Sequence, residues 1–238
     1  AVLDAAPTPA GEAATTAHSS ALALEFAVSG QPVVVNCGSG IGFGEAAATT
    51  SRRRQAHSSL EIGDRCPAVL SSPGSAGARL TTTGHVRGHV FGDGSSASAM
   101  VQSAEYLATT GLLVERRLRL DEAGLRLAGE DTVLATTGRT RNLAARQETR
   151  PVTIRFHLHP DVRARAATSS LIGLVLPNGD TWSFRTDAEN VELAPSAYYD
   201  RSRPRPRTTQ QIVATSHLID FWARIEWTFQ KIDDGSGP

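Results

Sequence analysis

The sequence predicts an all-β protein: a large antiparallel β-sandwich of two stacked sheets with few or no helices. Three observations predict it. Short stretches of β-branched or alternating apolar residues recur, clusters of Gly, Pro, Asn, Asp and Ser separate them, and helical periodicity is weak. The expected strands are residues 22–28, 33–37, 58–62, 85–91, 112–120, 125–132, 152–158, 171–176, 181–185, 210–214 and 223–229. Their spacing is typical of a sandwich.

Several connections carry the residues that tight turns require. Residues 177–180 (PNGD) are the clearest hairpin signal, because Asn-Gly tolerates the positive φ angles of a type I′ turn. Residues 29–32 and 121–124 carry the same signal less sharply. Residues 97–107 show the best helical pattern, although their serines fit a strand at least as well. The polar residues between 135 and 150 predict a long loop.

Size and charge bound what the protein can be. We expect one domain over residues 1–238, because a sandwich of this length buries one substantial core. Lys+Arg and Asp+Glu are both 24, so there is no global attraction to nucleic acid. No run of 18 or more apolar residues occurs, so no membrane-spanning helix is expected. The opening residues, which hold no signal stretch, predict a processed or truncated product.

Two basic clusters are candidate binding sites for anionic ligands. Only one residue, Lys231, is a lysine, so the positive charge is almost entirely guanidinium, which pairs well with carboxylates and sulfates. The candidate substrate contacts are Arg52, Arg53, Arg54, Tyr198, Tyr199, Arg203 and Arg205. A solvated hairpin loop is the favoured alternative for residues 201–207, a surface turn explains residues 52–54 equally well, and arginine usage can also reflect codon composition.

Two histidines and an asparagine stand at the ends of expected strands. His18 precedes one strand, Asn36 ends the next, and His57 opens a third. A sandwich can bring such residues to one rim, where two imidazoles and an oxygen form a plausible zinc shell. Ordinary polar residues at strand ends are the alternative, since the spacing alone is not specific.

These segments resemble the C-terminal domain of the heparinase II/III family. The resemblance rests on residues 17–26 (AHSSALALEF), 33–38 (VVVNCG) and 56–60 (AHSSL). It continues in the same order, from Tyr106 through residues 111–117 (GLLVERR), 129–131 (GED), 155–160 (RFHLHP), 182–185 (WSFR) and 209–213 (TQQIV).

The resemblance implies a site and an activity. In that family, positions matching His18, Asn36 and His57 bind a structural zinc, and the chain departs from the pattern at Asn36, where the family has a carboxylate. A catalytic histidine of the family falls on Thr16, which cannot act as a general base near neutral pH. The family's other catalytic residues come from an N-terminal helical toroid that these residues do not include, so no catalytic residue is assigned here.

By resemblance, the intact protein is expected to be a lyase that cleaves acidic polysaccharide, such as glycosaminoglycan, by β-elimination. The chain alone is expected to be inactive, with the toroid domain and the polysaccharide as partners. A periplasmic or secreted location is favoured. The resemblance leaves open whether the protein forms a homo-oligomer. The alternative is a non-catalytic carbohydrate-binding or structural module.

The remaining histidines and the cysteines leave alternatives open. His157 and His159 share one face of an expected strand, as a metal pair or as hydrogen-bonded structural residues. His85 and His89 are four apart, but the glycines around them oppose a helix. Cys37 and Cys66 can pair only if the fold brings them together.

Overall fold

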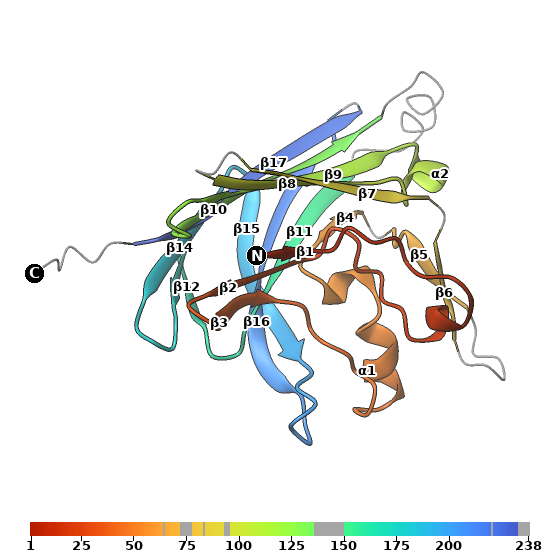
Figure 1. The fold of residues 1–238 in the computed structure, drawn as a ribbon, viewed down its shortest axis with the longest axis horizontal. Coiled ribbons are helices and arrows are strands. Elements are labelled where there is room, and N and C mark those ends of the chain that lie inside the picture. The colour runs from red at the N-terminus through yellow and green to blue at the C-terminus, as the bar shows by residue number, and fades with distance from the viewer. Residues whose placement is uncertain are drawn as a thin grey trace, which may run out of the picture.

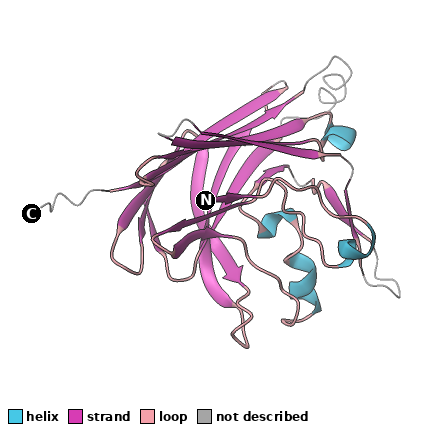
Figure 2. Cartoon of the chain, viewed as in Figure 1, coloured by secondary structure: helices cyan, strands magenta, loops and turns pink. Residues whose placement is uncertain are grey.

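A computed structural model describes residues 1–63, 65–71, 78–82, 84–92, 96–135, 150–219 and 221–232. Within them, two large antiparallel sheets stack on each other (Figure 1). Strands dominate and the helices are short (Figure 2). The helices are η1 (Gly11–Thr15), α1 (Glu45–Thr50), η2 (Arg54–Ala56) and α2 (Leu107–Thr110). The predicted all-β sandwich is confirmed. In the described residues, no helix is long and apolar enough to cross a bilayer.

The first sheet contains the strand ends that form the candidate site. Its order is β1 (Val2–Leu3), β2 (Leu24–Val28), β3 (Gln31–Val35), β11 (Pro151–Leu158), β16 (Arg207–His217) and β15 (Asn190–Tyr198). A seventh strand, β4 (Leu60–Ile62), also pairs with β11. Val35 pairs with His157, and Leu60 pairs with Ile154. The end of β3 and the start of β4 therefore follow each other along one edge of β11.

The second sheet has eight strands and forms the other layer. Its order is β12 (Arg163–Thr168), β13 (Leu171–Val175), β14 (Thr181–Thr186), β17 (Trp222–Lys231), β10 (Arg126–Leu134), β9 (Leu113–Asp121), β8 (Ser96–Ser103) and β7 (Val86–Gly92). A separate pair, β5 (Ala68–Leu70) and β6 (Leu80–Thr82), lies beside the loops of the first sheet.

The core lies between the two sheets and is rich in aromatic rings. Along β17, alternate residues are buried and exposed, which is the pattern of a strand with one face in the core. Phe156 of the first sheet meets Trp227 of the second with ring centroids 4.7 Å apart. Each such side chain stabilises the fold by roughly 1.5–3 kcal/mol when fully buried.

A buried ion pair of the second sheet also contacts the first. Arg116 on β9 donates from Nε to Asp131 Oδ1 at 2.7 Å and from Nη2 to Oδ2 at 3.0 Å, and both side chains are fully buried. Its Nη1 donates to the carbonyls of Leu22 and Ser58, each at 2.8 Å. Trp227 Nε1 donates to the same carboxylate at 2.7 Å. The guanidinium therefore joins the second sheet to two loops of the first.

The turns depart from expectation in one respect. Residues 177–180 do join β13 and β14, but only Gly179 has a positive φ, so the expected type I′ turn is wrong there. Ser29 and Gly30, with φ of 48° and 77°, both adopt the left-handed conformation between β2 and β3. The two-residue type I′ geometry therefore occurs at the weaker signal.

Most of the other expectations can be compared with the structure. Every expected strand overlaps an observed one, and the ambiguous residues 97–107 begin as strand β8. The sequence reasoning missed β1, β5, β6, β12 and β15, and the short helix α1. The predicted loop between 135 and 150 falls on residues 136–149, outside the described part of the chain.

Candidate functional site

The end of β3 and the loop before β4 form a rim of the sandwich. His57 follows η2, and its N–H donates to the carbonyl of Arg54 at 3.0 Å. The next residue, Ser58, donates from N to Asn36 Oδ1 at 2.9 Å and from Oγ to the Val35 carbonyl at 2.7 Å. These bonds fix Asn36 and His57 against each other, although they are far apart in sequence.

The rings of His18 and His57 touch. Their centroids are 5.3 Å apart and their planes make an angle of 74°. His57 is buried, 5% exposed, and among the described residues neither of its ring nitrogens has a hydrogen-bond partner. A buried imidazole without partners is costly. Both nitrogens are therefore available to a ligand that the protein itself does not supply.

Burial keeps both imidazoles neutral near pH 7. It is the main cause that lowers the pKa of His57 well below its usual value, and the charges of His18 and Arg54 act in the same direction. The pKa of His18 is also lowered by burial, opposed by a hydrogen bond to the backbone of Ser51. Neutral imidazoles have the free lone pair that a metal ion or a proton needs.

Asn36 lies in the same cleft but is partly engaged. Its Oδ1 accepts the bond from Ser58, and its Nδ2 donates to Glu25 Oε1 at 2.9 Å. An amide oxygen has a second lone pair, so one acceptor position remains. Glu25 brings a carboxylate to this rim that the sequence reasoning did not select. The outward position of Glu25 on β2, opposite Leu24 and Phe26, was the available signal.

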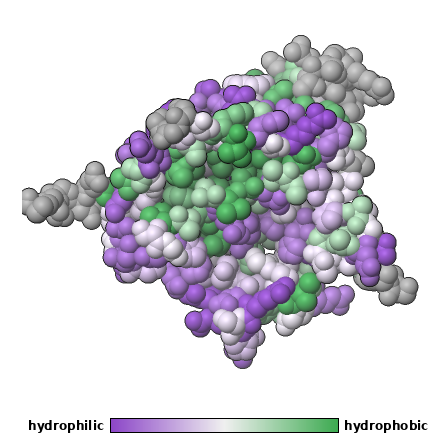
Figure 3. All heavy atoms as spheres, viewed as in Figure 1, coloured by the Kyte–Doolittle hydropathy of each residue, from purple (hydrophilic) through white to green (hydrophobic). Residues whose placement is uncertain are grey.

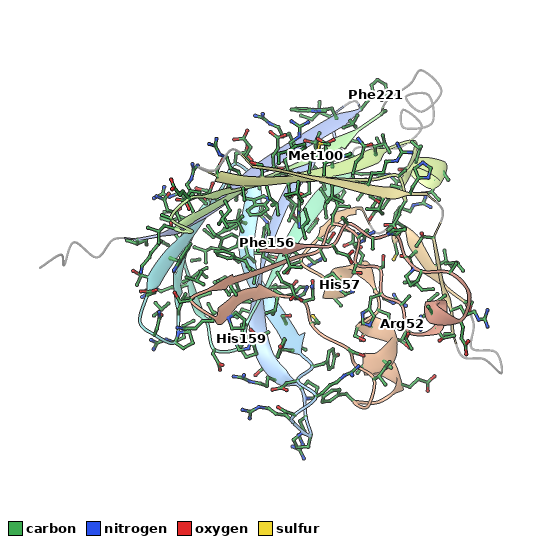
Figure 4. The ribbon with its side chains drawn as sticks, viewed as in Figure 1. Arg52, His57, Met100, Phe156, His159 and Phe221 are labelled. Atoms are coloured by element: carbon green, nitrogen blue, oxygen red, sulfur yellow. The ribbon has the colours of Figure 1, made fainter. Side chains whose placement is uncertain are left out.

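These side chains line an open cleft of about 870 Å³. Asp4 and its neighbours in the N-terminal segment form another wall, and Ser20 of the His18 loop also lines the cleft. Ser20 Oγ donates to Asp4 Oδ2 at 2.7 Å, which ties that wall to the His18 loop. Figure 4 labels His57 near the middle of the molecule and Arg52 on the side of the short helices. A neighbouring groove, which shares Leu3 with this cleft and is otherwise lined by Ala99, Leu118 and other apolar residues, belongs to the apolar surface visible in Figure 3.

Two of the predicted sugar-binding arginines have structural partners instead. Arg52 donates to the carbonyls of Ala17, Ala78 and Ala14 at 2.8, 2.9 and 2.7 Å. Arg54 is buried, bonds to the Ala21 carbonyl and pairs with buried Glu105. Both guanidiniums hold the segment that carries His18. Of the three consecutive arginines, only Arg53 is exposed.

The other predicted contacts lie at the end of the β15–β16 hairpin, and none of them lines the His18–His57 cleft. Tyr199 packs on Phe43 with ring centroids 5.4 Å apart, and Tyr198 meets His159 edge-on at 5.3 Å. Arg203 pairs with Asp200 at 3.5 Å, while Arg205 is exposed. The structure therefore divides the predicted contacts between a rim and a hairpin.

The histidines outside the cleft follow their structural alternatives. His157 is buried and hydrogen-bonded to Ser196 and to the carbonyl of Gln55. His89 lies on exposed strand β7. Cys37 and Cys66 are both free thiols, so they do not pair. In the described part of the chain, no three His, Cys, Asp or Glu side chains are grouped so that they could hold a metal ion. Asn36 belongs to none of these four residue types.

Solved structures with the same fold include a heparan sulfate lyase and a heparinase III. The heparan sulfate lyase HepC from Pedobacter heparinus is 13% identical, covers 99% of this chain and aligns with a TM-score of 0.71. A heparinase III structure is 12% identical over 90% of the chain, with a TM-score of 0.65. The chain spans only 33% and 30% of those two proteins. At these identities the likeness establishes the fold.

A curated relative shows closer sequence similarity over a shorter stretch. FtsZ-localized protein C from Caulobacter vibrioides is 33% identical over 124 residues, which is 52% of this chain and 21% of that protein. The sequence also matches the heparinase II/III-like, C-terminal family from residue 1 to residue 228. The chain therefore belongs to the heparinase II/III-like, C-terminal family.

Proposed function

We propose that this chain is the sandwich half of a protein that acts on acidic polysaccharide by β-elimination, and that it is inactive without a helical domain. The observation that carries the proposal is the pair His18 and His57, two neutral imidazoles in contact at the wall of an open cleft. Family membership and the lyase fold of the structural relatives support it.

The reaction needs more groups than this rim supplies. A base must remove the proton α to the uronate carboxylate, a positive group must stabilise the enolate-like state, and an acid must protonate the leaving oxygen. Thr16, at the position of a family catalytic histidine, is exposed and cannot accept that proton. The chain's role is therefore to form one wall of the groove, with the base and acid supplied by the other domain.

The same rim is our proposed zinc site, with His18, Asn36 and His57 as ligands. Two imidazoles on one tetrahedral zinc ion have ring centroids about 5 Å apart, and the observed separation is 5.3 Å. The unpartnered nitrogens of His57 also fit a metal ligand. Asn36 contributes a neutral oxygen, and Glu25 beside it offers the nearest negative charge. The zinc would have a structural role, joining the β2, β3 and β4 loops.

Elemental analysis tests the zinc site. Wild-type protein, His18→Ala and His57→Ala are purified with equal zinc, with exposed His85→Ala as the matched control. We expect about one zinc per chain in wild type and control, and loss in both cleft variants. Zinc retained by either cleft variant would show that the ligand set is wrong.

A product assay tests the requirement for a second domain. The chain is incubated with heparin-like and alginate-like substrates, and unsaturated products are followed by ultraviolet absorption. We expect no product from the chain alone. Product formation would overturn the proposal that the sandwich half is inactive by itself.

The second candidate is a non-catalytic carbohydrate-binding or assembly module. Thr16 and Asn36 favour it, because both replace residues that the family uses, and one relative is named for its localisation with FtsZ. Glycan-array binding without product formation, even with the helical domain present, would favour this candidate. Co-sedimentation with FtsZ polymers would test the assembly role.

A further inference from the structure

The proposed zinc ligands carry no negative charge of their own. The imidazoles of His18 and His57 and the amide of Asn36 are all neutral, so both positive charges of the ion would stay uncompensated. In the part of the chain that the structure describes, two carboxylates line the histidine cleft, those of Asp4 and Glu25. Either of them is a possible source of the compensating charge.

Asp4 is committed to holding the N-terminal segment in place. Its Oδ1 accepts a hydrogen bond from the backbone N–H of Ala6 at 2.9 Å, and its Oδ2 accepts from Ser20 Oγ at 2.7 Å. Both oxygens therefore bind neighbouring parts of the protein, and neither of these bonds reaches a proposed zinc ligand.

Glu25 contacts one of the proposed ligands. Its neighbours on β2, Leu24 and Phe26, are buried in the core, so the Glu25 side chain points outward, toward the cleft that it lines. Glu25 Oε1 accepts a hydrogen bond from Asn36 Nδ2 at 2.9 Å. Of the two carboxylates, Glu25 is the one that the structure bonds to a ligand.

The two partners of Asn36 fix which way its amide faces. The backbone N–H of Ser58 can only donate, so the atom that it meets at 2.9 Å is Oδ1. The ionised carboxylate of Glu25 can only accept, so the atom that it meets is Nδ2. A flipped amide would place donor against donor and acceptor against acceptor. The second lone pair of Oδ1 is therefore held in one orientation.

We propose that Glu25 is the positioning residue of the zinc site proposed above, on which this inference rests, and that it acts through the amide of Asn36. The bond from Nδ2 to the carboxylate shifts electron density toward Oδ1, which makes this oxygen a stronger ligand. Carboxylates act in the same way behind the histidines that bind zinc. Glu25 and Asn36 together then provide what a single carboxylate ligand would.

Glu25 is not itself a ligand in this arrangement. Among the described residues, no three His, Cys, Asp or Glu side chains are placed to hold one metal ion, so Glu25 does not join His18 and His57 as a third direct ligand. Replacing a partner that supports a ligand costs roughly tenfold to a hundredfold in metal affinity. Glu25 is exposed and water screens its charge, so we expect a smaller effect, of about fivefold.

Zinc affinity tests the role of this charge. The metal-free full chain is titrated with zinc against a chromogenic chelator. Glu25→Gln keeps an oxygen that accepts from Asn36 Nδ2 but removes the charge, and we expect zinc to bind about fivefold more weakly. The matched control is Glu192→Gln, which removes an exposed carboxylate from β15 of the same sheet and should leave the affinity unchanged. Urea unfolding of the metal-free protein should be the same in wild type and Glu25→Gln.

A double variant exchanges the two functional groups. Glu25→Gln/Asn36→Asp places the carboxylate at the ligand position, with an amide beside it that can donate to it. The net charge of the cleft equals that of wild type, so we expect the double variant to recover at least wild-type zinc affinity. Weak binding that persists in the double variant would contradict the proposed exchange of charge between the two positions.

His18→Ala separates this inference from the zinc site itself. If zinc binds and is lost in His18→Ala, while Glu25→Gln binds it as tightly as wild type or Glu192→Gln weakens it equally, the role of Glu25 is wrong and the zinc site stands. If wild type binds no zinc, or His18→Ala retains it, the zinc site is wrong and the role of Glu25 falls with it.

Discussion

At the scale of single residues, Arg116 holds the candidate site to the opposite sheet. Replacing it with alanine leaves Asp131 charged and buried, and removes the donor from the Leu22 and Ser58 carbonyls. Breaking a buried pair in this way costs about 3–5 kcal/mol. We expect Arg116→Ala to lower the free energy of unfolding by that amount in urea.

The neighbouring arginine provides the control. The Arg117 side chain is 60% exposed, and among the residues that the structure describes its ion pair is with Glu115. Arg117→Ala should change the free energy of unfolding by less than about 0.5 kcal/mol. Equal losses in the two variants would show that the buried network is not the source of the effect.

His157 makes stability depend on pH. Burial lowers the pKa of His157 to about 4, from 6.5 in the unfolded chain. Between these values the unfolded state binds more protons, so the free energy of unfolding falls as pH falls from 6.5 to about 4. Once the pH is below both pKa values, His157 has lowered the free energy of unfolding by about 3 kcal/mol.

Urea unfolding of metal-free protein across that pH range measures the effect. The pKa values of His18, His57 and His159 are lowered as well, so the wild-type slope reflects these groups together with His157. His157→Gln should reduce the slope by about one proton. An unchanged slope in His157→Gln would contradict the assignment.

At this scale the sequence predicted the three residues that line the cleft, but not the roles of the arginines beside it. His18, Asn36 and His57 were selected as strand-end residues, and they do line one cleft. Arg52 and Arg54 were expected to be exposed, because arginine is seldom fully buried. Only the three-dimensional arrangement shows that backbone carbonyls 26 to 38 residues away accept hydrogen bonds from these guanidiniums.

At the scale of elements, β10 and β17 pack closely at Gly129. A Cβ at this position would overlap the Trp227 indole on the paired strand. We expect Gly129→Ala to cost about 1–3 kcal/mol by overpacking and to shift Trp227 fluorescence. Gly173→Ala is the control, because its Cβ would meet nothing nearer than 3.9 Å.

The β15–β16 hairpin tests the proposed contact with acidic sugar. Arg203→Ser/Arg205→Ser removes two exposed charges, and we expect about fivefold weaker heparin binding at low salt with an unchanged fold. Arg163→Ser/Arg165→Ser, on edge strand β12, removes the same charge elsewhere. Equal weakening in both would indicate binding through general charge rather than through the hairpin.

Strands with a clear alternating pattern were predictable and others were not. β12 contains Ala and Arg in place of β-branched residues and is exposed along most of its length. β15 is an edge strand with a proline, which reads as a loop in isolation. Both strands exist because pairing with a neighbour satisfies their backbone groups, a long-range contribution that local patterns do not contain.

At the scale of the whole molecule, the sandwich followed from the sequence but the strand order did not. β17, the last strand, lies between β14 and β10, so the end of the chain completes the middle of the second sheet. Likewise, β3 and β4 share one edge of β11, which begins 116 residues after the end of β3 and 89 residues after the end of β4. Such pairings depend on contacts between distant segments, and strand periodicity says nothing about them.

The bond from Arg116 to the Ser58 carbonyl also has a consequence for how the molecule opens. Ser58 accepts from Leu24 and donates to Asn36, so the cleft loops share this anchor with the centre of the second sheet. We therefore expect the amide hydrogens of Leu24 and Ser58 to exchange with deuterium as slowly as those of β9 and β10. All of them would exchange through a single cooperative opening. Rapid exchange at these two amides, with β9 and β10 still protected, would mean that the rim opens locally and independently of the second sheet.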